Sequence, residues 1–247
     1  SAFLLNRSSD LLVNLSNEGY QVVFATHSAQ MVTSEDVSTS LLIRKNRERG
    51  TFMRKRMEDA VRQVVKDAPS QLQMLFSLSN SNELLFADYV LLTEGKTEWR
   101  VLPALFERIT GQSFALIKCA LVRQGGVSNT RKSMQVLSAM DIPVRAIVDL
   151  DYAFTTATRD GFLSANDPDI TECRNLFREL ACHNHLRLVN GLPVNKHSNI
   201  SASTAYAMMA SMPEAERPIR NIHNKLCEQG LWVWTRGAIE EHLGLNG

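Results

Sequence analysis

The sequence predicts an α/β fold in which a small parallel sheet is flanked by helices. Over residues 88–149, three short apolar runs alternate with two stretches of helical length. Strands that alternate with helices in this way form βαβ units, whose parallel strands are covered on both faces. Two of the apolar runs end in acidic residues, which cannot pack in a core. We therefore expect these acids at the carboxyl edge of the sheet, where α/β proteins place their functional sites.

The composition is that of a soluble globular protein. The chain has 247 residues, of which 44% are hydrophobic and 21% charged, and its formal net charge is +1. This charge excludes a global basic signature, so any affinity for DNA must come from local patches. The apolar runs are too short to cross a membrane, and the four cysteines show no paired spacing. We therefore expect a cytoplasmic protein that is not attached to a membrane.

Residues 1–82 are predicted to form a separate region of mixed α and β structure. Because the sequence begins directly with an amphipathic helix, we expect it to be the C-terminal piece of a longer protein. A polar break at 79–82 marks the expected boundary with the next domain. The expected elements are a helix over 3–18, a strand over 21–26, a β-hairpin within 39–56, and helices near 58–68 and 71–76.

The α/β core is predicted in two parts, over residues 83–154 and 230–247. Residues 155–229 leave the alternation of strands and helices and are predicted as a helical insertion. Core strands are expected over 88–94, 114–123, 144–149 and 231–235, core helices over 97–109, 128–140 and 238–243, and insertion helices over 171–182, 203–210 and 215–229.

Glu94 ends the first core strand, and Glu98 follows one helical turn later. If the helix begins near Gly95, this spacing places both carboxylates on one helical face. Gly95 would allow a tight turn and the close approach of a substrate. The alternative is that two acids near a helix N-terminus merely complement the helix dipole.

Asp149 and Asp151 end the third core strand. At positions i and i+2 of an extended strand, their side chains would face the same side. The residues around them are apolar, which argues against an ordinary solvated loop. Together with Glu94 at an equivalent strand end, they predict one shared carboxylate site.

The expected ligands are all carboxylate oxygens, which favour Mg²⁺ or Mn²⁺ over zinc. Four or five such groups carry enough charge for two ions. Two ions about 3.5–4 Å apart could activate a water and stabilise the leaving 3′-oxygen of a phosphodiester. The residues therefore indicate metal-dependent phosphoryl transfer.

Local basic and glycine-rich segments are candidate DNA contacts. The stretch 44–66 is dense in arginine and lysine, which could bind a phosphate backbone, although a solvated surface explains it equally well. The glycine pair at 125–126 could cradle a phosphate through its amides, or simply form a tight turn capped by Ser128 or Asn129. The candidates are Arg44, Lys45, Arg54, Lys55, Arg56, Gly125 and Gly126.

Three motifs together resemble the Toprim domain of OLD (overcoming lysogenisation defect) family nucleases. They are Leu84-Leu-Phe-Ala-Asp-Tyr-Val-Leu-Leu-Thr-Glu-Gly-Lys-Thr-Glu98, Asp149-Leu-Asp151 and Arg236-Gly-Ala-Ile-Glu240. Residues 22–28 are similar to the switch-histidine strand that closes an ABC-type ATPase domain. The resemblance implies that the N-terminal region is a remnant of such an ATPase domain and that the core is a Toprim sheet.

The resemblance also implies a metal-dependent endonuclease that nicks or cuts DNA. Arg236 stands where family members often have lysine; it keeps the positive charge but cannot act as an acid. It would neutralise the scissile phosphate, with Lys96 as a helper. By motif match, the expected metal ligands are Glu94, Glu98, Asp149, Asp151 and Glu240, and the expected catalytic residues are Glu94, Asp149, Asp151, Arg236 and Lys96.

The sequence has no Gly-x-x-x-x-Gly-Lys-Ser/Thr loop, so ATP is expected only in the full-length protein. That protein would be a homodimer through its ATPase domain, and the fragment alone is expected to be a monomer. Two other functions stay open on the same residues. One is nucleotidyl transfer, as in Toprim primases or topoisomerases, although the context of Tyr20, Tyr152 and Tyr206 does not suggest a strand-passage tyrosine. The other is a DNA-binding module without catalysis.

Overall fold

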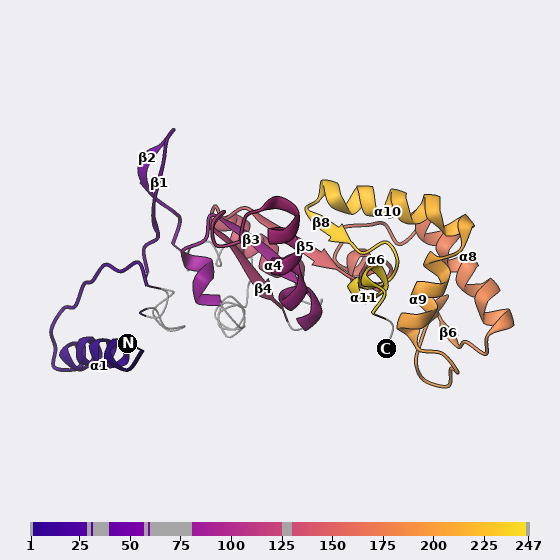
Figure 1. Ribbon diagram of the computed structural model, residues 1–247, viewed down its shortest axis with the longest axis horizontal. Coiled ribbons are helices and arrows are strands. Elements are labelled where there is room, and N and C mark those ends of the chain that lie inside the picture. Colours follow the sequence, from indigo (N-terminus) through magenta and orange to yellow (C-terminus); the bar gives the residue numbers. More distant parts are fainter. Residues whose placement is uncertain are drawn as a thin grey trace.

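The computed structural model describes residues 2–28, 31, 40–56, 59, 81–124 and 130–245. Its centre is a parallel sheet of four strands in the order β4-β3-β5-β8 (Figure 1). The predicted α/β class with a small parallel sheet is therefore confirmed. The strands are β3 (Tyr89–Thr93), β4 (Cys119–Arg123), β5 (Val144–Val148) and β8 (Leu231–Val233).

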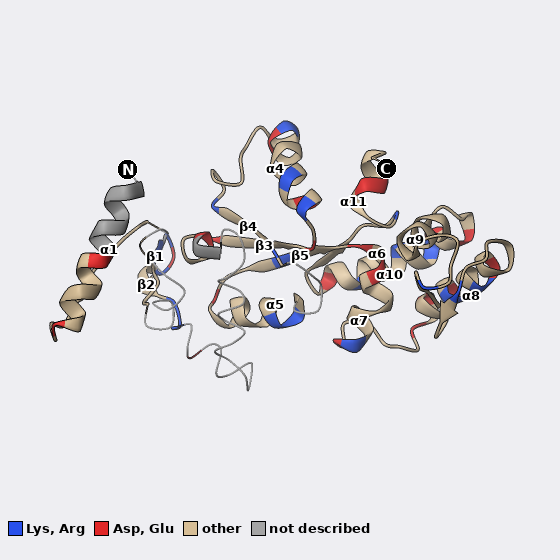
Figure 2. Ribbon diagram, turned by 90° about the horizontal axis from the view of Figure 1, so that it is seen from below, with Lys and Arg blue, Asp and Glu red and all other residues tan. Residues whose placement is uncertain are grey.

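Helices cover both faces of this sheet. Figure 2 shows α4 (Lys96–Thr110) and α11 (Ile239–Leu243) on one face and α5 (Thr130–Ala139) on the other. Strand residues such as Leu92, Val122 and Ala146 are fully buried. The strands read as nearly continuous apolar runs because a parallel sheet has no solvated face.

The segment after β5 is helical, as predicted, and the chain then returns to the same sheet. β8 pairs with β5 in parallel. It is therefore the neighbour of β5 in the sheet, although about eighty residues separate the two strands in the sequence. The helices are α6 (Leu150–Phe154), α7 (Thr156–Arg159), α8 (Pro168–His183), α9 (Ala202–Ala210) and α10 (Glu216–Glu228). A two-stranded ribbon of β6 (Leu188–Val189) and β7 (Leu192–Pro193) and a 3₁₀ turn over Pro213–Ala215 complete this segment.

Aromatic packing joins the core to the helical segment. The rings of Phe154, Phe177 and Tyr206 lie 5.0–6.0 Å apart between centroids, from α6, α8 and α9. These separations are those of favourable edge-to-face and tilted pairs. The helical segment therefore packs directly beneath α6, the helix that begins at the aspartate pair.

The N-terminal region departs from one expectation. The helix is present as α1 (Ala2–Asn17), and the hairpin as β1 (Ile43–Asn46) with β2 (Gly50–Met53). The strand expected over 21–26 is not formed, and Val23 is 86% exposed. No strand in the described part of the chain pairs with it, and an unpaired strand is not stable. The helices expected near 58–68 and 71–76 lie outside the described residues, apart from Asp59.

One core strand is much shorter than expected. β4 begins at Cys119 and not at Phe114, because the preceding residues form a turn in which Lys118 has a φ of 52°. A 3₁₀ helix over Ser81–Leu85 leads into β3, near the predicted domain boundary. No helix in the described residues has the length and apolar character that a membrane span needs.

A cluster of ion pairs holds the start of α8 against α10. Lys225 Nζ lies 2.7 Å from Asp167 Oδ2 and 2.7 Å from Asp169 Oδ2, and Asn221 donates a further hydrogen bond to Asp169. Burial opposes the charged form of Asp169, but the hydrogen bonds and charge of its partners outweigh burial and lower its pKa. The cluster therefore stabilises the helical segment as long as the aspartates are ionised.

Replacing Lys225 by Met should lower the free energy of unfolding by about 1–2 kcal/mol, because both carboxylates lose their cation while the aliphatic stem is kept. Since the pKa of Asp169 is lowered on folding, its contribution is present above the unfolded value of about 3.9 and is lost as the pH falls through the folded value. Chemical denaturation at neutral and acid pH measures both effects. Lys196→Met, at an exposed lysine, is the control, and an equal loss in that variant would contradict the assignment.

Candidate metal centre

Three neighbouring strands deliver acidic side chains to the carboxyl edge of the sheet. Glu94 follows β3, Asp149 follows β5, and Glu240 lies at the start of α11 after β8. Because β3, β5 and β8 are parallel and adjacent, their carboxyl ends meet at this edge. The predicted convergence of these strand ends is what the topology produces.

Asp149 and Asp151 reach this edge in a different way from the one predicted. β5 ends at Val148, Asp149 is the N-cap of α6, and Asp151 lies in its first turn. The argument from an extended strand is therefore wrong, since the chain turns into a helix between the two residues. The Asp149 amide donates a hydrogen bond of 3.3 Å to Glu94 Oε2, which ties the two strand ends together.

Glu98 is buried, with 3% of its surface exposed, at the third position of α4. Its Oε2 accepts a hydrogen bond of 3.2 Å from the amide of Gly95. A Cβ at position 95 would lie 2.8 Å from that oxygen, although the extended backbone there suits any residue. Gly95 thus permits the close approach of the Glu98 carboxylate, and not of a substrate as the sequence predicted.

Backbone hydrogen bonds fix the turn after β8 beside the aspartates. The Trp234 amide donates to Val148 O at 3.0 Å, and the Leu150 amide donates to Gly237 O at 2.7 Å. Gly237 has a φ of +119°, which a residue with a side chain adopts only with strain. The turn that carries Arg236 is therefore anchored on both sides of Asp149.

His242 holds the same turn from α11. Its Nε2 accepts a hydrogen bond of 3.2 Å from the Arg236 amide, and its ring lies 5.0 Å from that of Trp234. Burial lowers the pKa of His242, and the charge of Arg236 lowers it further. The neutral imidazole that this favours is the form that can accept the bond. No pattern in the sequence distinguishes this histidine from an ordinary surface residue.

The carboxylates at this edge oppose one another's ionisation. Burial raises the pKa of Glu94 to about 7, and the charges of Asp151 and Glu98 contribute to the rise. Burial raises the pKa of Asp149 to about 8, with further contributions from each of the other four carboxylates. The pKa of Asp151 is also raised, mainly by burial. Asp149 is therefore the residue whose pKa all four other carboxylates raise.

These residues fit a hard divalent cation in their chemistry. Asp149 Oδ1 is buried without a hydrogen-bond partner, and each of the five predicted ligands offers carboxylate oxygens. In the described residues, however, no three Asp, Glu, His or Cys side chains already converge as a ligand set. Binding an ion would therefore require side-chain rotation around backbone positions that are already in place.

Comparison with known proteins agrees with this geometry. A family model described as "Overcoming lysogenization defect protein-like, TOPRIM domain" matches residues 85–151. The chain is also 30% identical to the Old nuclease of Escherichia phage P2, over 98% of this chain and 41% of that protein. Residues 85–151 therefore match a Toprim domain of the OLD type. The family match contains Glu94, Glu98, Asp149 and Asp151 and ends before Glu240.

Further polar atoms at this edge of the OLD-type Toprim sheet have no partner. Thr93 Oγ1, Gln124 Oε1 and Trp234 Nε1 are buried and form no hydrogen bond with the described residues. Gln124 continues β4 alongside Glu94, since its amide donates to Thr93 O at 2.9 Å. The sequence analysis missed Gln124, although its position between a predicted strand and a glycine pair was visible.

The remaining predicted residues divide into three groups. Lys96 and Arg236 are exposed at the edge, where they are free to meet a ligand. The candidates Lys45, Lys55 and Arg56 are also exposed, but on or next to the β1–β2 hairpin. Gly125 and Gly126 lie outside the described residues.

Arg44 and Arg54 have a structural role that the sequence analysis did not assign to them. Arg44 donates hydrogen bonds of 2.7–3.0 Å to the carbonyls of residues 85, 86 and 87. Arg54 is 6% exposed and reaches Ala87 O at 3.4 Å. Both guanidinium groups attach the hairpin to the segment before β3.

The metal-free protein should lose stability as the pH rises from about 5 to about 9. The folded pKa values of Glu94 and Asp149, about 7 and about 8, exceed those of an unfolded chain. The folded state therefore binds more protons in this window and becomes less stable until both groups have ionised. Because ligands must lose their protons, Mg²⁺ or Mn²⁺ should raise the melting temperature more near pH 9 than near pH 6.

Asp149→Asn supplies the decisive variant for this melting experiment. It removes a buried charge, so it should raise the melting temperature of the metal-free protein at alkaline pH and abolish most of the response to metal. Glu107→Gln, at an exposed glutamate of α4, should change neither quantity. An equal metal response at both pH values, or an undiminished one in Asp149→Asn, would show that these carboxylates do not bind the ion.

Proposed function

We propose that this chain is a metal-dependent DNA endonuclease that hydrolyses phosphodiester bonds with Mg²⁺ or Mn²⁺. The observation that carries the proposal is the placement of acidic residues after three adjacent parallel strands, where Asp149 Oδ1 is buried without a hydrogen-bond partner. The raised pKa values of Glu94 and Asp149 agree with this placement. Such an excess of buried negative charge is costly unless a cation compensates it. The relative's name, Old nuclease, supports the reaction class. The chain spans 41% of that relative's length, so the activity of a whole protein is also a proposal.

Each carboxylate has a proposed place at the centre. Glu94, Asp149 and Asp151 would hold one ion, and Glu98 and Glu240 would help to hold a second. When bound, the ions supply a nucleophilic water near neutral pH and charge stabilisation for the leaving 3′-oxygen. The carboxyl groups release their protons on binding, which couples the raised pKa values to metal affinity.

The positive side chains at the edge would meet the substrate. Backbone hydrogen bonds anchor the turn after β8 to the residues on either side of Asp149, and Arg236 in this turn is exposed. A guanidinium there can bind a phosphate through two parallel hydrogen bonds and neutralise charge as it develops. Lys96, the first residue of α4, would add a second positive charge. Neither group acts as the proton donor in this proposal.

DNA is the proposed substrate, bound in part by the exposed Lys45, Lys55 and Arg56. Contacts of this kind make affinity depend strongly on salt. For a longer protein that contains this chain, we propose control by ATP in an N-terminal ATPase domain and a homodimer formed through that domain. The burial of Tyr152 and Tyr206, at 0% and 5% exposed, argues against either as a strand-passage nucleophile.

Supercoiled plasmid should be converted to nicked or linear DNA by this chain in the presence of Mg²⁺ or Mn²⁺. Chelation of the metal should stop the conversion, and Asp149→Ala should reduce it by at least about 100-fold, because the charge at the centre can no longer hold the ion. Gel electrophoresis of the plasmid forms measures the rate. Glu107→Gln should cleave at the wild-type rate. Failure of the wild-type chain to cleave, or cleavage that persists in Asp149→Ala, would refute the proposal.

Arg236→Gln should lower kcat for plasmid cleavage by about 100-fold, the order expected for one group that stabilises developing charge. The metal-induced rise in melting temperature should be unchanged, because Arg236 does not ligate the ion. Arg236→Lys should recover much of the rate, since it restores the charge without the bidentate geometry. Arg108→Gln, at an exposed arginine of α4, is the control. Unimpaired cleavage by Arg236→Gln would remove this residue from the mechanism.

A further inference from the structure

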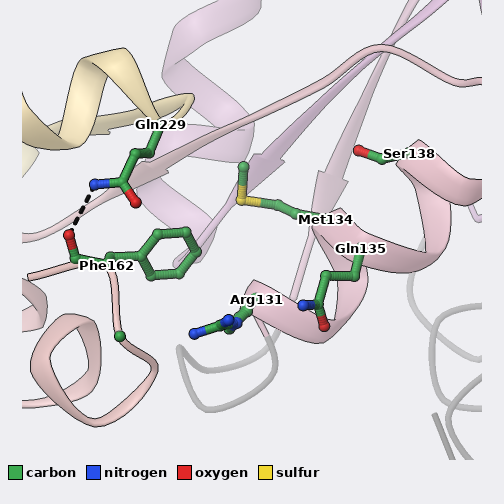
Figure 3. A pocket seen from close by; sticks show the side chains of 7 residues that line it. Arg131, Met134, Gln135, Ser138, Phe162 and Gln229 are labelled. Atoms are coloured by element: carbon green, nitrogen blue, oxygen red, sulfur yellow. Dashed lines mark hydrogen bonds between the residues drawn. The ribbon is translucent and has the colours of Figure 1, made fainter. Parts of the chain in front are cut away.

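A cavity of about 520 Å³ lies beside α5, away from the residues assigned to the metal centre (Figure 3). Its volume is in the range of small-molecule sites, about 300–1,000 Å³. Three separate parts of the chain form it: one side of α5, the loop after α7, and the residue that follows α10. The lining residues are Arg131, Met134, Gln135, Ser138, Gly161, Phe162 and Gln229.

A hydrogen bond from Gln229 holds the backbone of Phe162, the aromatic residue of this cavity. Gln229 Nε2 donates a hydrogen bond of 2.7 Å to the carbonyl of Phe162 (Figure 3). It donates another of 3.2 Å to the carbonyl of Lys225. The loop after α7 is thereby tied to the end of α10. Phe162 is partly buried against the core, and Figure 3 shows its ring between Gln229 and Arg131 and directed toward Met134. The cavity therefore has a pre-positioned aromatic and thioether wall.

Arg131 supplies a positive charge at the rim of the cavity. Its guanidinium lies 5.6 Å from the centre of the Phe162 ring. Gly161 makes room for it, because a Cβ at this position would lie 3.0 Å from Arg131 Nη1 and the glycine φ is +76°. No carboxylate in the described residues forms an ion pair with Arg131, and Lys132 beside it is exposed. The charge is thus available to an anionic ligand.

The polar side chains of the lining could contact a flat heterocycle at its edge. Gln135 and Ser138 are exposed on α5, one turn apart, and they offer both hydrogen-bond donors and acceptors. An aromatic wall, an arginine and edge-directed polar groups together suit a ligand that has a planar base and a phosphate. Aromatic rings and arginine are the groups with which proteins bind single-stranded nucleic acid.

We propose that this cavity binds one unpaired nucleotide of the DNA substrate, with the base against Phe162 and Met134 and the phosphate at Arg131. The proposal rests on DNA as the substrate and deepens it, since it selects DNA that has an unpaired or displaced nucleotide. Such DNA includes frayed ends, gaps and single-stranded segments. Fully paired DNA would have to extrude a base to fill the cavity.

Binding of a short fluorescein-labelled oligodeoxyadenylate, measured by anisotropy in chelator, tests the proposal without any need for cleavage. The parent is Asp149→Asn, which keeps the DNA intact. Phe162→Leu preserves apolar volume but removes the ring, and it should weaken binding by about tenfold, as loss of one stacked base implies. Arg131→Gln should weaken binding to a similar extent and reduce its dependence on salt. Tyr89→Leu and Arg108→Gln, at exposed positions elsewhere on the sheet and on α4, are the matched controls.

A second readout reports on stacking itself. An oligonucleotide containing 2-aminopurine should lose fluorescence on binding to the parent, and this quenching should be absent in Phe162→Leu. Melting temperatures verify that each variant is folded. Because Arg131 is exposed, Arg131→Gln does not disturb the hydrophobic core, and its binding result stands even if Phe162→Leu unfolds. Unchanged affinity in both variants, or absence of oligonucleotide binding by the parent, would overturn the proposal. Metal-dependent plasmid cleavage by the wild type would then still stand, so the two failures are distinguishable.

Discussion

The mutual repulsion of half-buried carboxylates at one edge of the sheet is the constraint on which the rest of the structure depends. A parallel sheet forces the ends of adjacent strands together, and in this chain three of those ends carry acids. Burial and neighbouring charge raise the pKa of Glu94 and Asp149 far above the values of free carboxyl groups. Ionising these buried carboxylates destabilises the metal-free fold, so packing elsewhere in the protein has to offset this loss of stability.

Among the described residues, backbone hydrogen bonds and buried apolar packing hold that edge, and no ion pair does. The turn after β8 is anchored to Val148 and Leu150, and the amide of Asp149 is bonded to Glu94. Beneath α6, the rings of Phe154, Phe177 and Tyr206 pack together. A fixed backbone with movable carboxylates suits a site that must accept an ion after folding, because only side-chain rotation remains to close it. It also explains why no ligand set has converged in the described residues.

The sequence predicted the fold class, the order of the core strands and helices, and the acids at the sheet edge, because apolar periodicity and strand-end position are local properties. It failed where the outcome depends on the partners of a segment. Residues 21–26 have the composition of a strand, yet no described strand pairs with them. In the sequence, Arg44 and Arg54 resemble exposed basic residues. Only the fold shows that they donate hydrogen bonds to the carbonyls before β3. Gln124 and His242 acquire their positions only from the sheet and the turn after β8, which no spacing in the sequence encodes.

The long excursion between β5 and β8 does more than connect two neighbouring strands. A crossover between adjacent parallel strands needs only one helix, whereas this segment uses five helices and a small ribbon. It contributes the packing under α6, the ion cluster that joins α8 to α10, and the two cavity walls that Phe162 and Gln229 form. Under the two proposals, the sheet supplies the reactive edge and the helical segment helps to select the nucleic acid that reaches it. Because the segment is anchored through α6, which begins at Asp149, a change in its packing would be transmitted directly to the residue whose pKa all four other carboxylates raise.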